Sequence, residues 1–201
     1  MIVLLDTSES LLKCSEELGC PVEQLITPLT RFNRQDSTAC FAIDNGAFSR
    51  FSPEAFLSLL AKHDHERNLC RFVSVPDVVG SARRTSESFT HWQHKLTGWN
   101  IALVAQDGQE DLEISWRVIS AIFIGGTTVW KMSKSAADII RCAKNIGKWV
   151  HAGRVNTPGR FEYFEELGAD SIDGTGLSRY SWMRERIYRN IAEPKLFEKI
   201  K

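Results

Sequence analysis

The sequence has no long apolar run and no excess of charge of either sign. No stretch approaches the ~18 consecutive apolar residues that a membrane-spanning helix needs. The short apolar run at the N-terminus ends at Asp6 and has no basic segment before it, which is not typical of a signal peptide. We therefore expect a soluble cytoplasmic protein that has no membrane partner. The 25 Lys and Arg residues balance the 25 Asp and Glu residues, which excludes a polybasic protein that holds nucleic acid by bulk charge alone but allows a local basic patch.

Cysteine is also scarce, and its spacing excludes a zinc ribbon. None of the five cysteines forms a Cys-x-x-Cys pair. The histidine pairs His63-x-His65 and His91-x-x-His94 have no third ligand candidate close by in the sequence. We therefore expect reduced thiols, no metal and no cofactor.

The 201 residues, 43% of them hydrophobic, favour a single domain over residues 1–201. Short apolar runs alternate with amphipathic segments, which is typical of βα units and a parallel sheet. The runs are 2–6, 40–44, 71–77, 101–107, 121–126, 148–153 and 169–173, and the expected helices are 8–18, 53–67, 81–97, 111–119, 133–146, 157–167 and 178–192.

These units fit a compact (β/α) barrel of the TIM type with seven or eight parallel strands, or else an open doubly wound sheet. No Gly-x-Gly-x-x-Gly follows the first run, and this weakens the second alternative. Segment 20–39 has little apolar periodicity. We expect it to be a long connection, a lid or a substrate loop that carries Arg31 and Arg34.

Polar residues follow nearly all of the apolar runs, as they do at the active face of a barrel. Asp44, Asp77 and Asp173 each end a run, and Gln106 ends another. A single aspartate at such a position is often only a helix N-cap. Two carboxylates across one pocket can instead act as nucleophile and general acid/base at a sugar anomeric carbon.

Six motifs in this order resemble the queuine/archaeosine tRNA-guanine transglycosylase superfamily, and most closely its small members thought to act on DNA. The motifs are Asp44-Asn-Gly-Ala-Phe48, Val75-Pro-Asp-Val-Val-Gly80, Gln106-Asp-Gly108, Ile124-Gly-Gly126, His151-Ala-Gly-Arg-Val-Asn-Thr-Pro158 and Gly168-Ala-Asp-Ser-Ile-Asp173. The resemblance implies a modified (β/α)8 barrel. It also implies the exchange of a guanine in a polynucleotide for a 7-deazaguanine base, through a covalent aspartyl–sugar intermediate.

The resemblance implies a role for each matching residue. Asp173 is the nucleophile, and Asp44 handles the proton of the leaving and incoming bases. Asp77 accepts hydrogen bonds from the N1–H and amino group of the purine, and Gln106 faces its carbonyl edge. The remaining substrate-binding positions are Asn45, Gly125, Gly126, whose N–H is expected to point at O6, and Gly153.

The sequence departs from the family at Asn45, Ala47 and Ser49, where the family has Ser, Gly and Gln. No cysteine follows Cys142, so the family's zinc segment after the nucleophile is not found, and we expect DNA rather than tRNA as substrate. Two alternatives stay open: a non-catalytic purine- or nucleic-acid-binding module, and a hydrolase of the glycosidic bond.

Basic residues suggest contacts with a phosphate backbone. The segment from Arg179 onward has more Lys and Arg than Asp and Glu, which indicates a nucleic-acid contact or else a solvated helix face. The residues expected to contact nucleic acid are Lys131, Arg154, Arg179 and Arg184. His151 lies inside an apolar run, and we interpret it as a hydrogen-bonded pocket-wall residue. A partner protein or a homo-oligomer is plausible for so short and neutral a chain.

Overall fold

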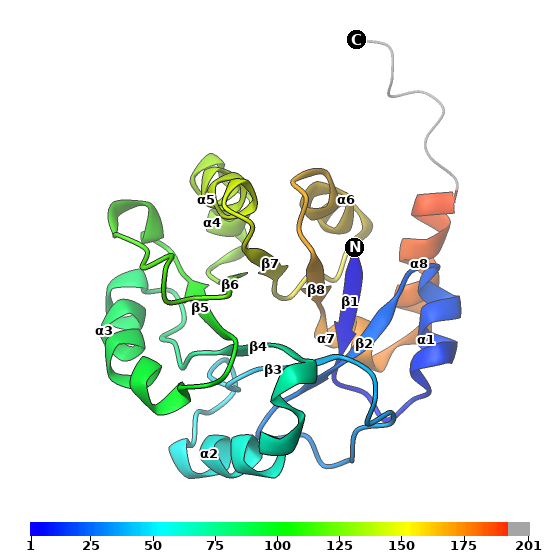
Figure 1. The fold of residues 1–201 in the computed structure, drawn as a ribbon. Coiled ribbons are helices and arrows are strands. Elements are labelled where there is room, and N and C mark those ends of the chain that lie inside the picture. The colour runs from blue at the N-terminus through cyan, green and yellow to red at the C-terminus, as the bar shows by residue number, and fades with distance from the viewer. Residues whose placement is uncertain (193–201) are drawn as a thin grey trace.

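The computed structural model describes residues 1–192 and has eight parallel strands that close into a barrel (Figure 1). The strands follow one another around the barrel in chain order, and β1 pairs with both β2 and β8. This confirms the predicted TIM-type barrel. The strands are β1 Ile2–Leu5, β2 Val22–Ile26, β3 Phe41–Ile43, β4 Cys70–Ser74, β5 Ile101–Ala105, β6 Ala121–Ile124, β7 Trp149–Ala152 and β8 Ser171–Asp173.

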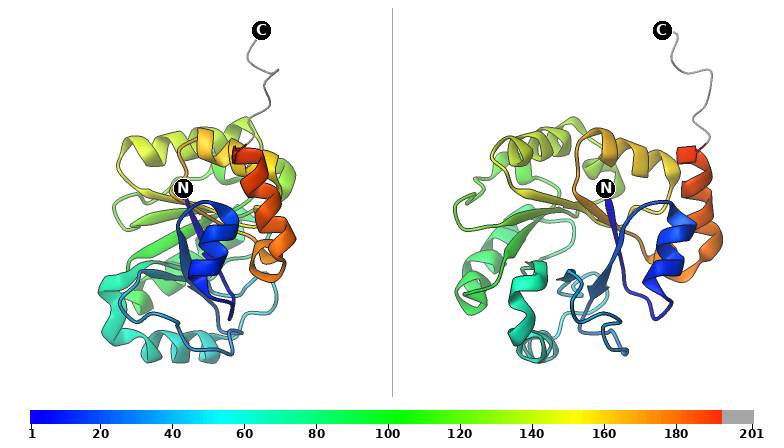
Figure 2. Two further views of the ribbon diagram at one scale, coloured as in Figure 1. Left: turned by 90° about the vertical axis from the view of Figure 1, so that its right-hand side faces the viewer. Right: turned by 45° about the vertical axis from the view of Figure 1, so that its right-hand side comes forward.

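Helices form the outer layer around the strands (Figures 1 and 2). They are α1 Leu11–Leu18, α2 Pro53–Lys62, α3 Ala82–Trp92, α4 Thr128–Lys131, α5 Lys134–Asn145, α6 Pro158–Glu166, α7 Thr175–Arg179 and α8 Ser181–Ala192, with 3-10 turns η1 Asp64–Leu69, η2 Gln93–Leu96 and η3 Gln109–Asp111. Ser52 accepts a hydrogen bond from the Ala55 N–H and Pro53 occupies the first turn, so α2 begins as its sequence predicts. None of the helices in residues 1–192 combines the length and the apolarity needed to cross a membrane.

Alternating side chains of each strand build the two layers of the core. Leu4, Phe72 and Phe123 belong to a cluster that fills the barrel. Their neighbours Val3 and Leu5 pack outward against helices. The period of two along each strand produces this division.

Strand β2 corrects the prediction that 20–39 is one long connection. Glu23 and Gln24 interrupt the apolar run, which hides the strand from a pattern search. Both find partners in the fold. Glu23 pairs with Arg71 at 2.6 Å, and the buried Gln24 accepts a hydrogen bond from the Gln35 N–H at 3.0 Å.

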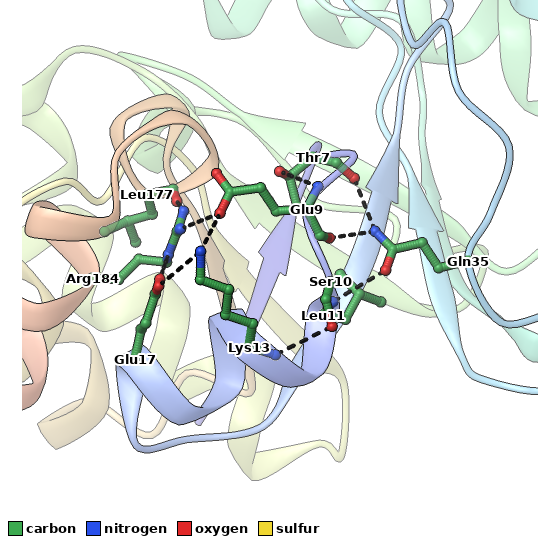
Figure 3. Close-up of polar contacts among 9 residues, drawn as sticks. All are labelled: Thr7, Glu9, Ser10, Leu11, Lys13, Glu17, Gln35, Leu177 and Arg184. Atoms are coloured by element: carbon green, nitrogen blue, oxygen red, sulfur yellow. Dashed lines mark hydrogen bonds and ion pairs between the residues drawn. The ribbon is translucent and has the colours of Figure 1, made fainter.

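The rest of that segment is a loop held on several sides. Arg34 pairs with Glu66 at 2.8 Å, and its guanidinium lies 3.9 Å from the centroid of the Phe41 ring. Gln35 accepts a hydrogen bond from the Leu11 N–H at 3.1 Å (Figure 3). The loop is therefore attached to the barrel through Arg34 and Gln35. Arg31, in the same loop, is exposed.

Two expected helices differ from the prediction. Residues 111–119 form no α-helix, because Leu112, Ile114 and Trp116 alternate with exposed residues at a period of two. The expected helix 178–192 is split into α7 and α8 at Tyr180, which is extended. The helix that usually follows a barrel strand is therefore replaced by η3 and an irregular segment between β5 and β6.

Arg184 is a structural residue, which corrects its predicted role as a nucleic-acid contact. Its side chain is fully buried between α8 and α1, and a buried guanidinium cannot reach a phosphate backbone. The guanidinium donates to Glu17 at 2.5 Å, to Glu9 at 2.9 Å and to the Leu177 carbonyl at 2.7 Å (Figure 3). Arg186 and Arg189 on the same helix are exposed. Lys195, Lys199 and Lys201, which contribute to the basic segment, lie outside the described residues.

We expect Arg184→Ala to lower the free energy of unfolding by about 3 kcal/mol, because it removes the buried partner of Glu9 and Glu17 and leaves them only their longer pairs with the exposed Lys13. Urea denaturation monitored by circular dichroism measures this change. Arg189→Ala is the matched control on α8, since its pair with Glu185 is exposed and should contribute less than about 1 kcal/mol. Equal effects of the two substitutions would contradict the structural role of Arg184.

Candidate active site

A cavity of ≈ 340 Å³ lies at the carboxyl ends of the strands. Eight residues predicted from the sequence line it together: Asp44, Asn45, Asp77, Gln106, Gly125, Arg154, Asp173 and Arg179. In a parallel barrel all carboxyl ends meet at one rim, so residues from β3 to β8 converge there although they are far apart in the chain.

Asp173 ends β8, and both of its carboxylate oxygens are held by donors. His151 lies 3.0 Å from Oδ2, and the Arg154 backbone N–H donates to Oδ1 at 3.1 Å. Burial by itself would raise the pKa of Asp173, but these hydrogen bonds and the nearby charge of Lys131 outweigh burial and hold the pKa below its usual value. Asp173 is therefore ionised at neutral pH.

Arg154 is the one non-glycine residue with a positive φ among the described residues, at 60°. This strained conformation aims its N–H at Asp173. Its guanidinium donates to the Gly126 carbonyl and lies 4.4 Å from the centroid of the Phe48 ring. Phe48 is 64% exposed and lines the cavity. Arg154 and Phe48 together therefore present a cation and an aromatic face to the cavity.

Asp44 directly follows β3 and has the opposite electrostatic character. Its Oδ1 accepts hydrogen bonds from the Ser74 hydroxyl at 2.7 Å and from the Asn45 N–H at 2.9 Å. Burial, reinforced by the negative charges of Asp173 and Asp77, outweighs these bonds and raises the pKa of Asp44 to about 6. Asp44 can therefore both donate and accept a proton near neutral pH.

Asp77 lies between two amide side chains. Asn45 donates to its Oδ1 at 2.9 Å, and Gln106 donates to its Oδ2 at 2.6 Å. The Gln106 carbonyl oxygen accepts from the N–H groups of Gly80 and Gly126 at 2.9 Å each, which fixes the orientation of the amide. Burial raises the pKa of Asp77 despite these bonds. The three side chains form one fixed hydrogen-bonding edge on the cavity.

Two glycines predicted for the site, Gly126 and Gly153, do not line the cavity. The Gly126 N–H, expected to point at a base carbonyl, donates to Gln106 instead. Gly153 packs under the wall, where an added Cβ would lie 2.5 Å from the Phe123 ring and 3.3 Å from Asp173 Oδ2. Close packing by itself therefore requires glycine at Gly153.

Lys131 is also corrected from a phosphate contact to a buried residue. It is 1% exposed and donates to the Gly153 carbonyl at 2.5 Å. Burial is the main cause that lowers its pKa to about 8. Its remaining role is electrostatic, as a positive charge near Asp173.

Two contributors to the site, Asp6 and Ser74, have no role predicted from the sequence. Asp6 directly follows β1 and lines the cavity, and Thr30 donates to its Oδ1 at 2.8 Å. Its position after an apolar run is the same signal that identified Asp44. Ser74, which binds Asp44, is buried inside β4 and has no such signal. Burial raises the pKa of Asp6.

The described residues bring together one set of three potential metal ligands, Glu9, Cys14 and Glu17. This set lies at α1 and contributes nothing to the cavity lining. Arg184 already pairs with both carboxylates. The cluster is therefore accounted for as an ion-pair network.

Two carboxylates of one cavity with opposite pKa shifts, Asp173 and Asp44, have the electrostatic properties that a nucleophile and a general acid/base need. Asp173 has the lowered pKa and both oxygens oriented, as a nucleophile needs. Asp44 has the raised pKa, as a general acid/base needs.

Comparison with known proteins defines the fold only. No family model matches the chain, and no curated protein matches it. Among solved structures, the chain is similar to one in the Amycolatopsis orientalis BexX/CysO complex, with a TM-score of 0.52 and 14% identity over 94% of this chain and 86% of that chain. It also matches a PaMucR phosphodiesterase in a c-di-GMP complex, with a TM-score of 0.42 and 17% identity over 70% of this chain. The match spans 61% of that phosphodiesterase.

Because the two pKa shifts have opposite directions, replacing Asp44 and replacing Asp173 by asparagine should change the free energy of unfolding in opposite directions. Because the pKa of Asp44 rises from 3.8 to about 6 on folding, the folded state binds this proton more tightly. Stability therefore falls as pH rises between these values, by up to about 3 kcal/mol. We expect Asp44→Asn to stabilise the protein by about 1–3 kcal/mol at pH 7, with no difference near pH 4.

Asp173→Asn should do the reverse. Its lowered pKa stabilises the fold above the ordinary value of 3.8, and this contribution is lost as pH falls through the folded pKa. The variant should be less stable than the wild type at pH 7. Urea denaturation of both variants from pH 4 to pH 8 measures the two effects, and shifts of the same sign at pH 7 would contradict the assignment.

Proposed function

We propose that this protein is a base-exchange enzyme that replaces guanine in a nucleic acid with a 7-deazaguanine base, through a covalent bond between Asp173 and C1′ of the sugar. The observation that carries the proposal is the pair of buried carboxylates with opposite pKa shifts, Asp173 and Asp44, beside the fixed Asp77–Gln106 edge of the same cavity. The motif resemblance supports the same assignment of roles.

The proposed chemistry balances with these two carboxylates. In the first half, a carboxylate oxygen of Asp173 bonds to C1′, the bond from C1′ to N9 of guanine breaks, and Asp44 supplies a proton to the departing base. In the second half, the incoming base gives its N9 proton to Asp44, N9 bonds to C1′, and Asp173 leaves as a carboxylate. A pKa of about 6 suits Asp44 to both transfers.

The polar edge of the cavity fits a purine of the guanine type. The carboxylate of Asp77 accepts from an N1–H and an adjacent amino group, which adenine does not present together. The amide nitrogen of Gln106 has a second hydrogen besides the one given to Asp77, and it can donate to the neighbouring carbonyl. Phe48, exposed at the mouth, offers a stacking face.

DNA is the polymer that we propose first, following the sequence. A guanine in a duplex must leave the stack to reach a cavity of this kind. Arg179, Tyr180 and Trp182 are exposed at the junction of α7 and α8, and Arg179 lines the cavity. These residues supply cationic and aromatic contacts suitable for the strand around a flipped nucleotide.

The test is incubation with labelled guanine and with guanine-containing DNA or RNA, in single- and double-stranded form. Incorporation of the label measures exchange, and intact-protein mass spectrometry measures the covalent adduct. We expect both with the wild type. Release of guanine without incorporation would indicate a hydrolase, and guanine binding without adduct or release would indicate a binding module.

We expect Asp173→Asn to bind guanine but to lose exchange and adduct by a factor on the order of 10³ or more. Asp77→Asn should weaken guanine binding about 10- to 100-fold, because its amide presents a donor to the N1–H and amino donors. Asp138→Asn, on the outer helix α5, is the matched control and should behave as wild type. If Asp173→Asn retains exchange while Asp44→Asn loses the adduct, the two roles are reversed.

A further inference from the structure

A chain of three hydrogen bonds leads from Trp149, the first residue of β7, to Asp173. The Trp149 indole N–H donates to Ser171 Oγ at 2.9 Å, Ser171 Oγ lies 2.9 Å from His151 Nδ1, and His151 Nε2 lies 3.0 Å from Asp173 Oδ2. All four side chains come from the neighbouring strands β7 and β8. The chain therefore ends on the residue with the lowered pKa.

The partners of His151 determine which ring nitrogen carries the hydrogen when the ring is neutral. The carboxylate of Asp173 can only accept, so Nε2 carries the hydrogen and donates. In that tautomer Nδ1 is an acceptor, and the Ser171 hydroxyl donates to it. Ser171 keeps an oxygen lone pair for the Trp149 N–H, so every donor in the chain has an acceptor.

The environment of His151 excludes direct contact with a substrate. The side chain is fully buried, and its ring packs 4.5 Å from the Phe123 centroid and 5.0 Å from the Phe72 centroid. Both ring nitrogens are occupied. His151 can therefore influence a reaction in the cavity only through Asp173.

Other charged groups also act on Asp173. Arg154 contributes its backbone N–H, and Lys131 contributes positive charge from α4. Asp44, which directly follows β3, lines the same cavity and carries a negative charge when it is ionised. Among these groups only His151 and the Arg154 N–H bond the carboxylate directly, and the backbone N–H cannot be removed by changing a side chain.

We propose that His151, oriented by Ser171, is the positioning residue that fixes the carboxylate plane of Asp173 for attack and stabilises it as it leaves. This inference rests on the proposed function for the reaction that it assists. In the first half the Nε2–H holds the carboxylate in one orientation toward the cavity. In the second half the same hydrogen bond stabilises the negative charge that returns to Asp173.

The test compares His151→Phe, which removes both ring nitrogens, with His151→Gln, whose amide N–H restores a donor. Two quantities are measured: the rate of adduct formation against pH, and the pH titration of Asp173 by NMR with ¹³C-labelled aspartate. We expect His151→Phe to slow adduct formation about 10- to 100-fold, the range for losing a hydrogen bond to a charged group. It should also move the acid limb of the rate profile and the Asp173 titration to higher pH.

His151→Gln should recover a large part of both effects, and guanine binding should stay unchanged because Asp77 and Gln106 are intact. His63→Phe is the matched control. His63 is a buried histidine whose Nδ1 lies 2.7 Å from Glu66 Oε2, and it does not line the cavity. It should change neither quantity. Ser171→Ala gives a second, milder variant if His151→Phe fails to fold, and it should shift the Asp173 titration in the same direction.

The NMR titration separates the two proposals. If no polymer supports exchange but the Asp173 titration still rises in His151→Phe, the proposed function fails and the positioning role stands. If the titration and the acid limb are the same in wild type, His151→Phe and Ser171→Ala, the positioning role is overturned whatever the reaction is.

Discussion

Pairing between β1 and β8 closes the barrel, with Leu4 opposite Asp173 in the register. Closure leaves no sheet edge and places the carboxyl ends of all eight strands on one rim. Without it, the ends of β3 and β8 would lie at a distance across an open sheet. Asp44 and Asp173 instead line one cavity and influence each other's pKa. The Arg184 network attaches α8 to α1 on the outside of the same seam.

The site depends on burial acting on two chemically identical groups. Burial opposes the charged form of both Asp44 and Asp173, so the difference between them comes from their partners. Asp173 has an imidazole, a strained backbone N–H and the nearby charge of Lys131. Asp44 has a hydroxyl, one backbone N–H and two neighbouring carboxylates. The ionised form of Asp44 therefore reduces the stability of the fold, as expected for a carboxylate kept in a poorly solvated position.

The sequence located most of the site because strand ends in βα units are marked by a change from apolar to polar residues. Asp44, Asp77, Gln106 and Asp173 all follow such a change, and all line the cavity. Lys131 and Arg184 were instead predicted to be exposed nucleic-acid contacts, because a charged side chain is usually solvated. Both are buried, and each is satisfied by partners that are distant in the chain.

The sequence by itself determined the alternation of strands and helices and the rim residues, since these depend on local periodicity and on residue types at strand ends. The missing Gly-x-Gly-x-x-Gly and the motif resemblance favoured a barrel over an open sheet, and the pairing of β1 with β8 decided it. Tertiary structure alone decided the rest. Strand β2 forms because Glu23 and Gln24 meet partners from other units. His151 is directed at Asp173 because β7 and β8 pair in one register. Contacts between residues about twenty or more positions apart depend on strand pairing and closure, and no local pattern encodes them.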